Sequence, residues 1–179
     1  PHGVDLGELK PCLPDRLLTE NKRINLAPSF LVKDLDRLKA DAEDSQTYPF
    51  ALIGRRHLRD NNSWLHNSER LVKGKNRCTL LINSSDAESL TIENGQSIRV
   101  SSRVGAIEIA CEISDKIMSG VVSIPHGYGH GRDGVRLDTA KKHAGVSIND
   151  LTDERVLDEL TGNAAFSNVR VRLEAAQKI

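Results

Sequence analysis

The chain has 179 residues, with 25 basic and 25 acidic side chains and therefore no formal net charge. This length fits one globular domain, or one domain with an arm, whose core needs no metal or disulfide for stability. The charge balance argues against a dedicated nucleic-acid binder, and a hydrophobic fraction of 38% argues against a disordered chain.

Residues 1–47 form a segment that differs from the rest in its residue pattern. It holds four of the six prolines and shows little strand patterning. One helix is predicted there, with Ser29 as its cap. The aliphatic residues that would share one face of this helix are Leu31, Val32, Leu35 and Leu38. We therefore expect residues 1–47 to be a lead-in arm with one helix, and residues 48–179 to be the folded domain.

From residue 48 onward, the sequence predicts short strands separated by turns. Apolar runs, several of them strictly alternating, mark strands at 50–53, 78–82, 97–102, 106–114, 120–125 and 167–173. Two short helices are also expected, one opened by a capping box between Ser85 and Glu88 and one over residues 152–160 with Thr152 as its cap. Closely spaced strands with few helices favour a mainly β fold, a barrel or a sandwich with small helical insertions.

The cysteines and the first residues of the chain indicate the environment and the origin of the polypeptide. Three widely spaced cysteines without a C-x-x-C pair predict neither a disulfide framework nor a thiolate metal site, and they favour a reduced, cytoplasmic environment. The apolar runs are too short for a membrane span, and residues 1–10 lack the pattern of a signal peptide. The chain begins at Pro1 and its one methionine is Met118, so we expect it to be part of a longer polypeptide.

The most unusual segment is the glycine-rich run at 126–134, which follows an apolar strand. Four glycines in nine residues let backbone amides approach a phosphate or a polar heterocycle, although a mobile surface loop has the same composition. Three of these glycines satisfy G-x-G-x-x-G, but the strand–helix context of a dinucleotide fold is missing. His126 and His130 lack a second pair of ligands, so a structural metal is not expected.

A second donor-rich segment spans residues 54–67 and contains the only tryptophan. Arginine forks suit phosphate oxygens, and asparagine and serine side chains suit the edge of a purine-like or pterin-like ring. A solvated basic loop has the same composition, and Asn149 is also typical of a turn. No G-x-S-x-G, H-E-x-x-H or P-loop motif is present. The residues by themselves therefore predict two donor-rich loops able to share one ligand, and no catalytic set.

Five segments in a particular order resemble a known family. They are 52–67, 83–105, 120–129, 149–152 and a final strand at 169–171. In this order they resemble the C-terminal dinucleotide-binding domain of the molybdopterin oxidoreductases, the group of formate dehydrogenases, nitrate reductases and dimethyl sulfoxide reductase. The resemblance covers about Tyr48 to the C-terminus, and residues 1–47 resemble the segment leading into that domain. It implies a double-psi β barrel, the aspartate-decarboxylase-like barrel, in agreement with the short strands.

The resemblance also implies a ligand, the bis(molybdopterin guanine dinucleotide) cofactor that carries molybdenum or tungsten. By position, the residues expected to bind this cofactor are Gly54, Arg55, Arg56, Trp64, His66, Asn67, Pro125, His126, Gly127, Tyr128 and Asn149. Their expected role is to donate hydrogen bonds to pyrophosphate and pterin, while the cofactor performs the redox step.

The family's iron–sulfur cysteines and its metal ligand belong to earlier domains, and nothing in this chain corresponds to them. The chain thus resembles a fragment of a larger oxidoreductase, inactive alone and without a catalytic residue or metal ligand of its own. Its expected partners are the other parent domains, which would hold any iron–sulfur cluster, and an electron partner that the sequence does not identify. The segment after Gly54 is nearest to formate-dehydrogenase-like members. The alternative is a non-catalytic, protein-binding adaptor on the same barrel; neither nucleic acid nor a membrane is an expected partner.

Overall fold

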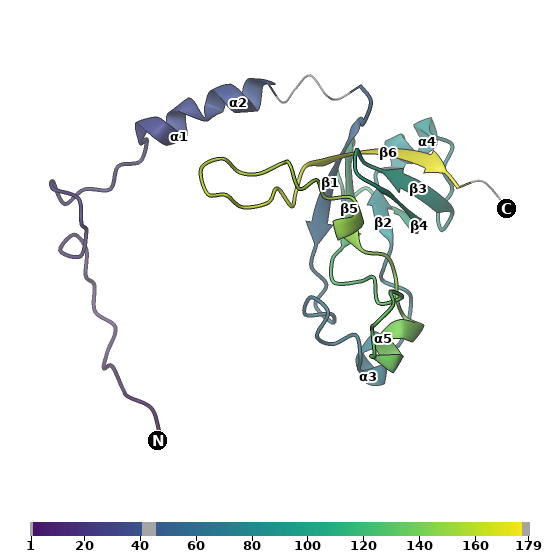
Figure 1. The fold of residues 1–179 in the computed structure, drawn as a ribbon, viewed down its shortest axis with the longest axis horizontal. Coiled ribbons are helices and arrows are strands. Elements are labelled where there is room, and N and C mark those ends of the chain that lie inside the picture. Colours follow the sequence, from purple (N-terminus) through teal and green to yellow (C-terminus); the bar gives the residue numbers. More distant parts are fainter. Residues whose placement is uncertain (1, 41–45, 177–179) are drawn as a thin grey trace. The chain divides into compact units, whose positions relative to one another are not determined.

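The computed structural model describes residues 2–40 and 46–176, and the chain divides into two compact units (Figure 1). The first unit is Pro1–Asp41 and the second is Ala42–Ile179. In the described part of the chain, no helix has both the length and the apolar character needed to cross a membrane. Every described strand belongs to the second unit.

The first unit contains two short helices, α1 (Ser29–Lys33) and α2 (Leu35–Ala40), where the sequence predicts a single one. Asp34 separates them. Its backbone amide donates to the carbonyl of Leu31 at 3.2 Å, three residues back, so the four-residue repeat of an α-helix is broken at this position.

The start of α1 also differs from the expectation. Pro28, and not the predicted serine, occupies the N-cap position, and no side chain caps the helix. Leu31, Val32 and Leu35 of the predicted apolar face are exposed, and the side chain of Leu38 lies outside the described residues.

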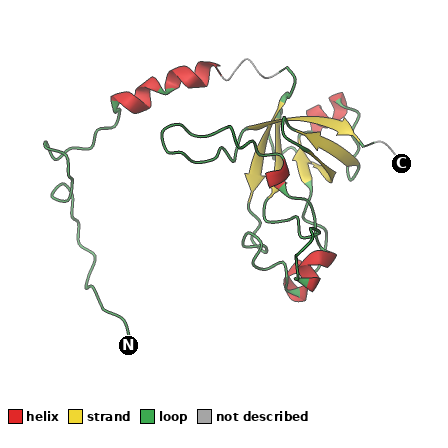
Figure 2. Cartoon of the chain, viewed as in Figure 1, coloured by secondary structure: helices red, strands yellow, loops and turns green. Residues whose placement is uncertain are grey.

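The second unit is built around a closed six-stranded barrel (Figures 1 and 2). In chain order its strands are β1 (Phe50–Arg55), β2 (Leu80–Ile82), β3 (Ser97–Ser101), β4 (Ala106–Ile113), β5 (Val121–Pro125) and β6 (Val169–Ala175). Around the barrel the order is β1–β5–β2–β4–β3–β6, and the pairs β1–β5 and β2–β4 are parallel while the other four are antiparallel. The predicted mainly β barrel with small helices is confirmed, and the mixed strand directions are consistent with the double-psi type.

Aliphatic side chains fill the barrel, as the alternation predicts. On β4, Ile107 and Ile109 are buried while Glu108 between them is exposed. The other strands contribute side chains with no exposed surface: Leu52, Leu80, Ile98, Val122 and Val171. Full burial of one such side chain contributes about 1.5–3 kcal/mol. The barrel core therefore holds the strand ends, and the loops that start there, in fixed positions.

Four short helices lie in the connections of the described second unit. They are α3 (Glu69–Val72), α4 (Ser84–Ser89), α5 (Asp138–Lys142) and the 3₁₀ helix η2 (Ile148–Asp150). The predicted capping box is wrong, because Asn83 is the N-cap of α4 and its Oδ1 accepts from the amide of Ser85 at 2.9 Å. Asparagine caps as well as serine does, and here it stands earlier in the chain, so Ser85 lies inside the helix.

Residues 152–168, called the projecting loop below, do not form the predicted helix (Figure 1). The two arms of the loop meet in a β-bridge between Leu157 and Ala164. Thr152, the predicted cap, instead donates its hydroxyl to the carbonyl of Asn149 at 3.0 Å. Pairing between the two arms replaces the local helix, whose propensity is a weak preference that tertiary contacts override.

Candidate functional site

The loops that follow β1 and β5 leave the barrel at the same end. These strands are parallel neighbours, and their register pairs Arg55 with Pro125, the last residue of each. Beyond the strands, the amide of His126 donates to the carbonyl of Arg55 at 3.3 Å. Because the carboxyl ends of parallel neighbours meet at one edge, the donor-rich segment 54–67 and the glycine-rich segment 126–134 lie close together.

A cavity of about 440 Å³ opens at this end, within the range of roughly 300–1,000 Å³ typical of small-molecule sites. Its lining residues are Arg56, Asn62, His126, Gly127, Tyr128, Ser147, Ile148, Asn149 and Phe166. They come from the loop after β1, the loop after β5, the η2 segment and the end of the projecting loop. Five of them are predicted site residues: Arg56, His126, Gly127, Tyr128 and Asn149. Among the described lining residues none is acidic and Arg56 is a cation, so the cavity suits an anionic ligand rich in hydrogen-bond acceptors.

Asn62 connects the two sides of the cavity. Its Oδ1 atom accepts a hydrogen bond from Nε2 of His126 at 2.6 Å, and the guanidinium of Arg56 donates to the same oxygen. Since an amide oxygen only accepts, Nε2 of His126 carries the hydrogen. Burial lowers the pKa of His126, and the charge of Arg56 lowers it further. The His126 ring is therefore neutral at pH 7 and oriented before any ligand binds.

Gly127 allows the close approach of these loops. Its φ of +92° lies in the left-handed region, and a Cβ atom at this position would stand 2.3 Å from the carbonyl oxygen of Asn62. Atoms at that separation overlap, and the neighbour is backbone, which does not move aside easily. Position 127 therefore requires glycine, because a side chain there would prevent the contact between the two loops.

A buried carboxylate lies beneath the cavity. Asp60 is 1% exposed and accepts hydrogen bonds from the Tyr128 hydroxyl at 2.9 Å and from Nη2 of Arg77 at 2.8 Å. Burial by itself raises the pKa of Asp60, but the hydrogen bonds from Arg77 and Tyr128 outweigh it and hold the pKa below its ordinary value. The ionised Asp60 thus ties the cavity-lining Tyr128 to the loop after β1.

His66 belongs to the same buried cluster. It is 1% exposed, and its Nδ1 lies 2.8 Å from Nε2 of His130. Its Nε2 lies 3.5 Å from Oδ1 of Asp60 and has no hydrogen-bond partner among the described atoms. A hydrogen on this Nε2 faces the carboxylate favourably, which leaves Nδ1 to accept from His130. Burial lowers the pKa of both histidines. His66 thus supports the glycine-rich loop from below and does not line the cavity.

Two further predicted residues have their polar atoms engaged elsewhere. The Arg55 guanidinium donates to the carbonyl of Ser123 and to the carbonyl and hydroxyl oxygens of Thr79, at 2.7 and 3.0 Å. Oδ1 of Asn67 accepts from the amide of Ala140 at 3.2 Å and from that of the preceding residue at 3.1 Å, in the first turn of α5. Both residues join segments of the unit to one another and stand outside the cavity lining.

The last three predicted residues also lie outside the lining. Trp64 is 82% exposed, and Pro125 is buried at the end of β5. Gly54, near the end of β1, faces Phe166, since a Cβ at this glycine would lie 3.3 Å from Cε1 of that ring. Of the eleven predicted residues, five therefore line the cavity and six lie outside its lining.

Several residues of the site were missed. Asn62 and Asp60 lie inside the donor-rich segment, so their polar side chains could have been singled out. Ser147 and Ile148 precede the predicted Asn149 directly. Phe166 belongs to no sequence motif that could have singled it out. It reaches the cavity only because the chain returns there on its way to β6.

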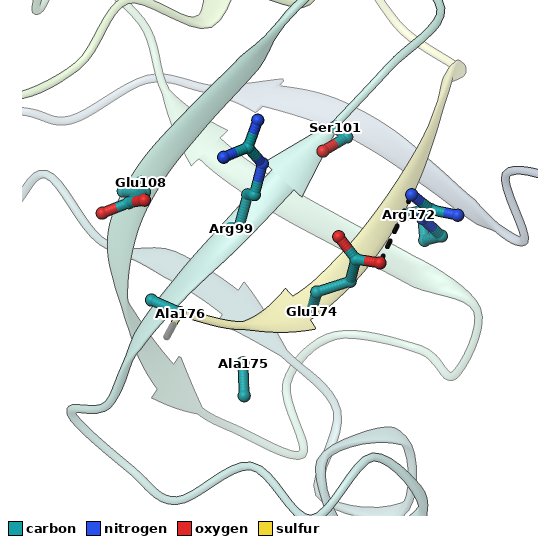
Figure 3. A pocket seen from close by; sticks show the side chains of 7 residues that line it. All are labelled: Arg99, Ser101, Glu108, Arg172, Glu174, Ala175 and Ala176. Atoms are coloured by element: carbon teal, nitrogen blue, oxygen red, sulfur yellow. Dashed lines mark ion pairs between the residues drawn. The ribbon is translucent and has the colours of Figure 1, made fainter. Parts of the chain in front are cut away.

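A larger hollow of about 760 Å³ lies on the outer face of β3, β4 and β6 (Figure 3). Its lining residues are Arg99, Ser101, Glu108, Arg172, Glu174, Ala175 and Ala176. The charges are of both signs, and Arg172 pairs with Glu174 at 3.3 Å. This hollow contains no predicted site residue and no preference for one sign of charge, so its greater volume does not make it the better candidate.

The described histidines form no metal centre. Within residues 2–40 and 46–176, no cluster of histidine, cysteine, aspartate and glutamate is placed to hold a metal ion. His126 and His130, separated by three residues, turn to different partners, Asn62 and His66.

The sequence pattern of the family described as "Molydopterin dinucleotide binding domain" matches residues 50–170, which include the whole cavity lining. The chain is 32% identical over 124 residues to the dimethyl sulfoxide reductase DmsA of Haemophilus influenzae, covering 69% of this chain and 15% of that protein. It is also 32% identical over 128 residues to the F420-dependent formate dehydrogenase subunit alpha of Methanocaldococcus jannaschii, covering 70% and 18%.

A solved structure has the same fold. Acetylene hydratase from Pelobacter acetylenicus superposes with a TM-score of 0.64 at 19% identity, over 77% of this chain and 20% of that one. At this identity the similarity concerns the fold alone. The matched region is about a fifth or less of the length of each of these three proteins.

Proposed function

Since the chain belongs to the family of molydopterin dinucleotide binding domains, we propose that the cavity beside Asn149 holds part of a molybdopterin dinucleotide. One observation carries this proposal. Four segments, the loop after β1, the loop after β5, the η2 segment and the end of the projecting loop, converge on one cavity that has a cation, several neutral donors and no acidic residue among its described lining residues.

The donor set fits such a cofactor. A dinucleotide presents phosphate oxygens, which suit the guanidinium of Arg56, and a ring system edged with nitrogen and oxygen atoms, which suits the amide of Asn149. The neutral ring of His126 is already oriented by Asn62 at 2.6 Å. Preorganised side chains lose little conformational entropy on binding, which favours affinity.

We assign the residues as follows. Arg56 binds a phosphate, Asn149 donates to the ring edge, and the backbone of Gly127 lets the glycine-rich loop close over the ligand. Asp60 and Tyr128 hold this loop in place from beneath. When bound, the cofactor supplies electron transfer at its metal, and this chain contributes binding and orientation.

The parent protein is proposed to be a molybdenum or tungsten oxidoreductase of which this chain is the C-terminal domain. The small share of each relative that the chain spans supports this, as do the names of the two relatives, one a reductase and the other a dehydrogenase. A formate-dehydrogenase-like parent is the narrower proposal, supported by the relative from Methanocaldococcus jannaschii. On this proposal the chain alone has no turnover, the other domains are its partners and hold any iron–sulfur cluster, and the location is cytoplasmic. The match to a cofactor-binding family does not favour the adaptor alternative.

The proposal is tested by nuclear magnetic resonance on the ¹⁵N-labelled chain. Pterin-6-carboxylate and guanosine diphosphate serve as probes for the two halves of the dinucleotide. We expect shifts at Arg56, residues 126–128 and Asn149, and a loss of affinity of about fivefold or more in Asn149→Ala, the equivalent of one hydrogen bond of about 1 kcal/mol. Asn163→Ala, in the projecting loop, is the matched control. Absence of shifts at the cavity, or shifts around the hollow of Figure 3 instead, would overturn the proposal.

A further inference from the structure

Phe166 is an exposed aromatic ring at the wall of the cavity. It lines the cavity together with Asn149 and Arg56, and 41% of its surface is exposed. Large apolar side chains that remain exposed inside a concave site mark a place for a ligand. The proposed function assigns no role to this ring.

The other rings at the cavity are already engaged. Tyr128 donates its hydroxyl to Asp60 at 2.9 Å, and its ring lies 4.3 Å from that of His66. His126 is held by Asn62. Unlike Tyr128 and His126, Phe166 is not held by a hydrogen bond to the loops beneath the cavity. Its ring therefore offers the cavity an aromatic surface.

The position of the Phe166 ring is nevertheless set by its neighbours. A Cβ at Gly54 would stand 3.3 Å from Cε1 of the ring, so the bare backbone of this glycine makes room for it. On another side the ring of His126 lies 6.1 Å away at 79°, an edge-to-face arrangement. The Phe166 ring thus sits against β1 and next to the His126 ring.

The backbone on both sides of Phe166 is also anchored. The amide of Ala165 donates to the carbonyl of Val156 at 2.9 Å, and the amide of Asn168 donates to the carbonyl of Leu52 in β1, also at 2.9 Å. Although Phe166 belongs to the projecting loop, it lies between two fixed points. Its ring is therefore presented to the cavity in advance of binding.

We infer that Phe166 binds the ligand, by stacking its ring against the flat heterocycle of the cofactor, and that Gly54 is the residue that gives this ring its place. The inference rests on the proposed function. Stacking of a nucleobase-like ring on an aromatic side chain is sequence-tolerant and strong, and its loss lowers affinity by roughly 5- to 100-fold. Cavity donors would then recognise the edge of the heterocycle, and Phe166 its face.

The test uses the whole chain and the fluorescent probe pterin-6-carboxylate. Stacking is expected to quench the probe on titration with wild-type chain. Phe166→Leu keeps an apolar side chain against Gly54 but has no aromatic face, so we expect its affinity to fall by roughly 5- to 100-fold. Phe166→Tyr and Phe166→Trp restore the face and are expected to recover most of the affinity and the quenching. Leu160→Ala, at an exposed position of the same projecting loop, is the matched control and is expected to bind as wild type.

Gly54→Ala is an independent second test, because the added methyl group touches the Phe166 ring and not the ligand. The added methyl group is expected to displace the ring and to weaken probe binding by a smaller factor than Phe166→Leu, with an unchanged circular-dichroism spectrum. Equal binding by wild type and Phe166→Leu would overturn the stacking role and leave the cavity proposal standing. If wild-type chain fails to bind the probe at all, the proposed function falls, and the role of Phe166 with it.

Discussion

The hydroxyl of Tyr128 donates a 2.9 Å hydrogen bond to Oδ2 of Asp60, 68 positions away in the sequence. This contact joins the loop after β5 to the loop after β1, directly beneath the cavity. Burial and the hydrogen bond to Asp60 raise the pKa of the Tyr128 hydroxyl, so it remains a donor throughout the physiological range.

Replacement of this tyrosine by phenylalanine tests the contact. Tyr128→Phe leaves the buried carboxylate of Asp60 with one donor fewer, and hydrogen bonds to charged groups contribute about 1.5–3 kcal/mol. We expect the free energy of unfolding, measured by urea denaturation, to fall by an amount in this range. The chain has one other tyrosine, and Tyr48→Phe is the control that removes the same atom elsewhere. Equal stabilities of the two variants would contradict a structural role for the contact.

Three histidines at and beneath the cavity predict a pH dependence of stability. Burial lowers the pKa values of His66, His126 and His130 in the folded chain. Below the unfolded histidine pKa of about 6.5, the unfolded state then binds more protons than the folded state, and stability decreases as the pH falls. The urea midpoint is expected to drop between pH 7 and pH 5, and His66→Asn should flatten this slope. A midpoint that rises toward pH 5 would show that these groups gain their protons more easily in the folded state.

The depressed pKa of Asp60 adds a second loss at lower pH. The stability that its ionised form contributes is complete above the unfolded aspartate pKa of about 3.9 and disappears as the pH falls through the lower folded value. Asp60→Asn is expected to be less stable than wild type at pH 7, with the difference narrowing below pH 4. If the difference in stability between wild type and Asp60→Asn stayed constant across this pH range, the difference would not arise from protonation of Asp60.

Gly127 and Gly134 have similar backbone angles, so replacing each by alanine distinguishes backbone strain from steric overlap. Gly127 has a φ of +92° and a neighbouring backbone oxygen 2.3 Å from its hypothetical Cβ, whereas Gly134 has a φ of +85° and nothing within 4 Å. Gly134→Ala is expected to cost about 1–2 kcal/mol of unfolding free energy for the backbone angle alone. Gly127→Ala should cost clearly more, because the loop must also move away from Asn62. The two costs are compared by denaturant unfolding, and equal values would mean that the loops separate freely.

Adjacent arginines are expected to behave differently. Arg55→Lys loses most of the hydrogen bonds to Thr79 and Ser123, so the free energy of unfolding should fall by about 1–3 kcal/mol. Arg56→Gln, at an exposed position, should change it by no more than about 0.5 kcal/mol. In titrations with guanosine diphosphate we expect Arg56→Gln to bind more weakly and Arg55→Lys, where folded, to bind nearly as wild type. Weaker binding by the lysine variant alone would assign the phosphate to Arg55.

The elements of the barrel were predictable because strand alternation is local. The run from Ile107 to Cys111 shows every second side chain buried, and the six strands appear near their predicted positions. Helix starts and the projecting loop were less predictable. Asn83 and Ser85 are both good caps, and the bridge between Leu157 and Ala164 is a contact across the loop that no local pattern contains.

Two donor-rich loops, each placed after an apolar strand, and an asparagine that follows later in the chain are visible in the sequence without any knowledge of the fold. Which of these polar side chains face the cavity depends on contacts between segments that are distant in the sequence. The parallel pairing of β1 with β5 brings the loops together, and burial turns Arg55, His66 and Asn67 toward partners inside the unit, while Arg56, His126 and Asn149 line the cavity. Residue type sets what a side chain can bind, whereas its direction depends on the neighbours that satisfy its polar atoms, and those neighbours lie far away along the chain.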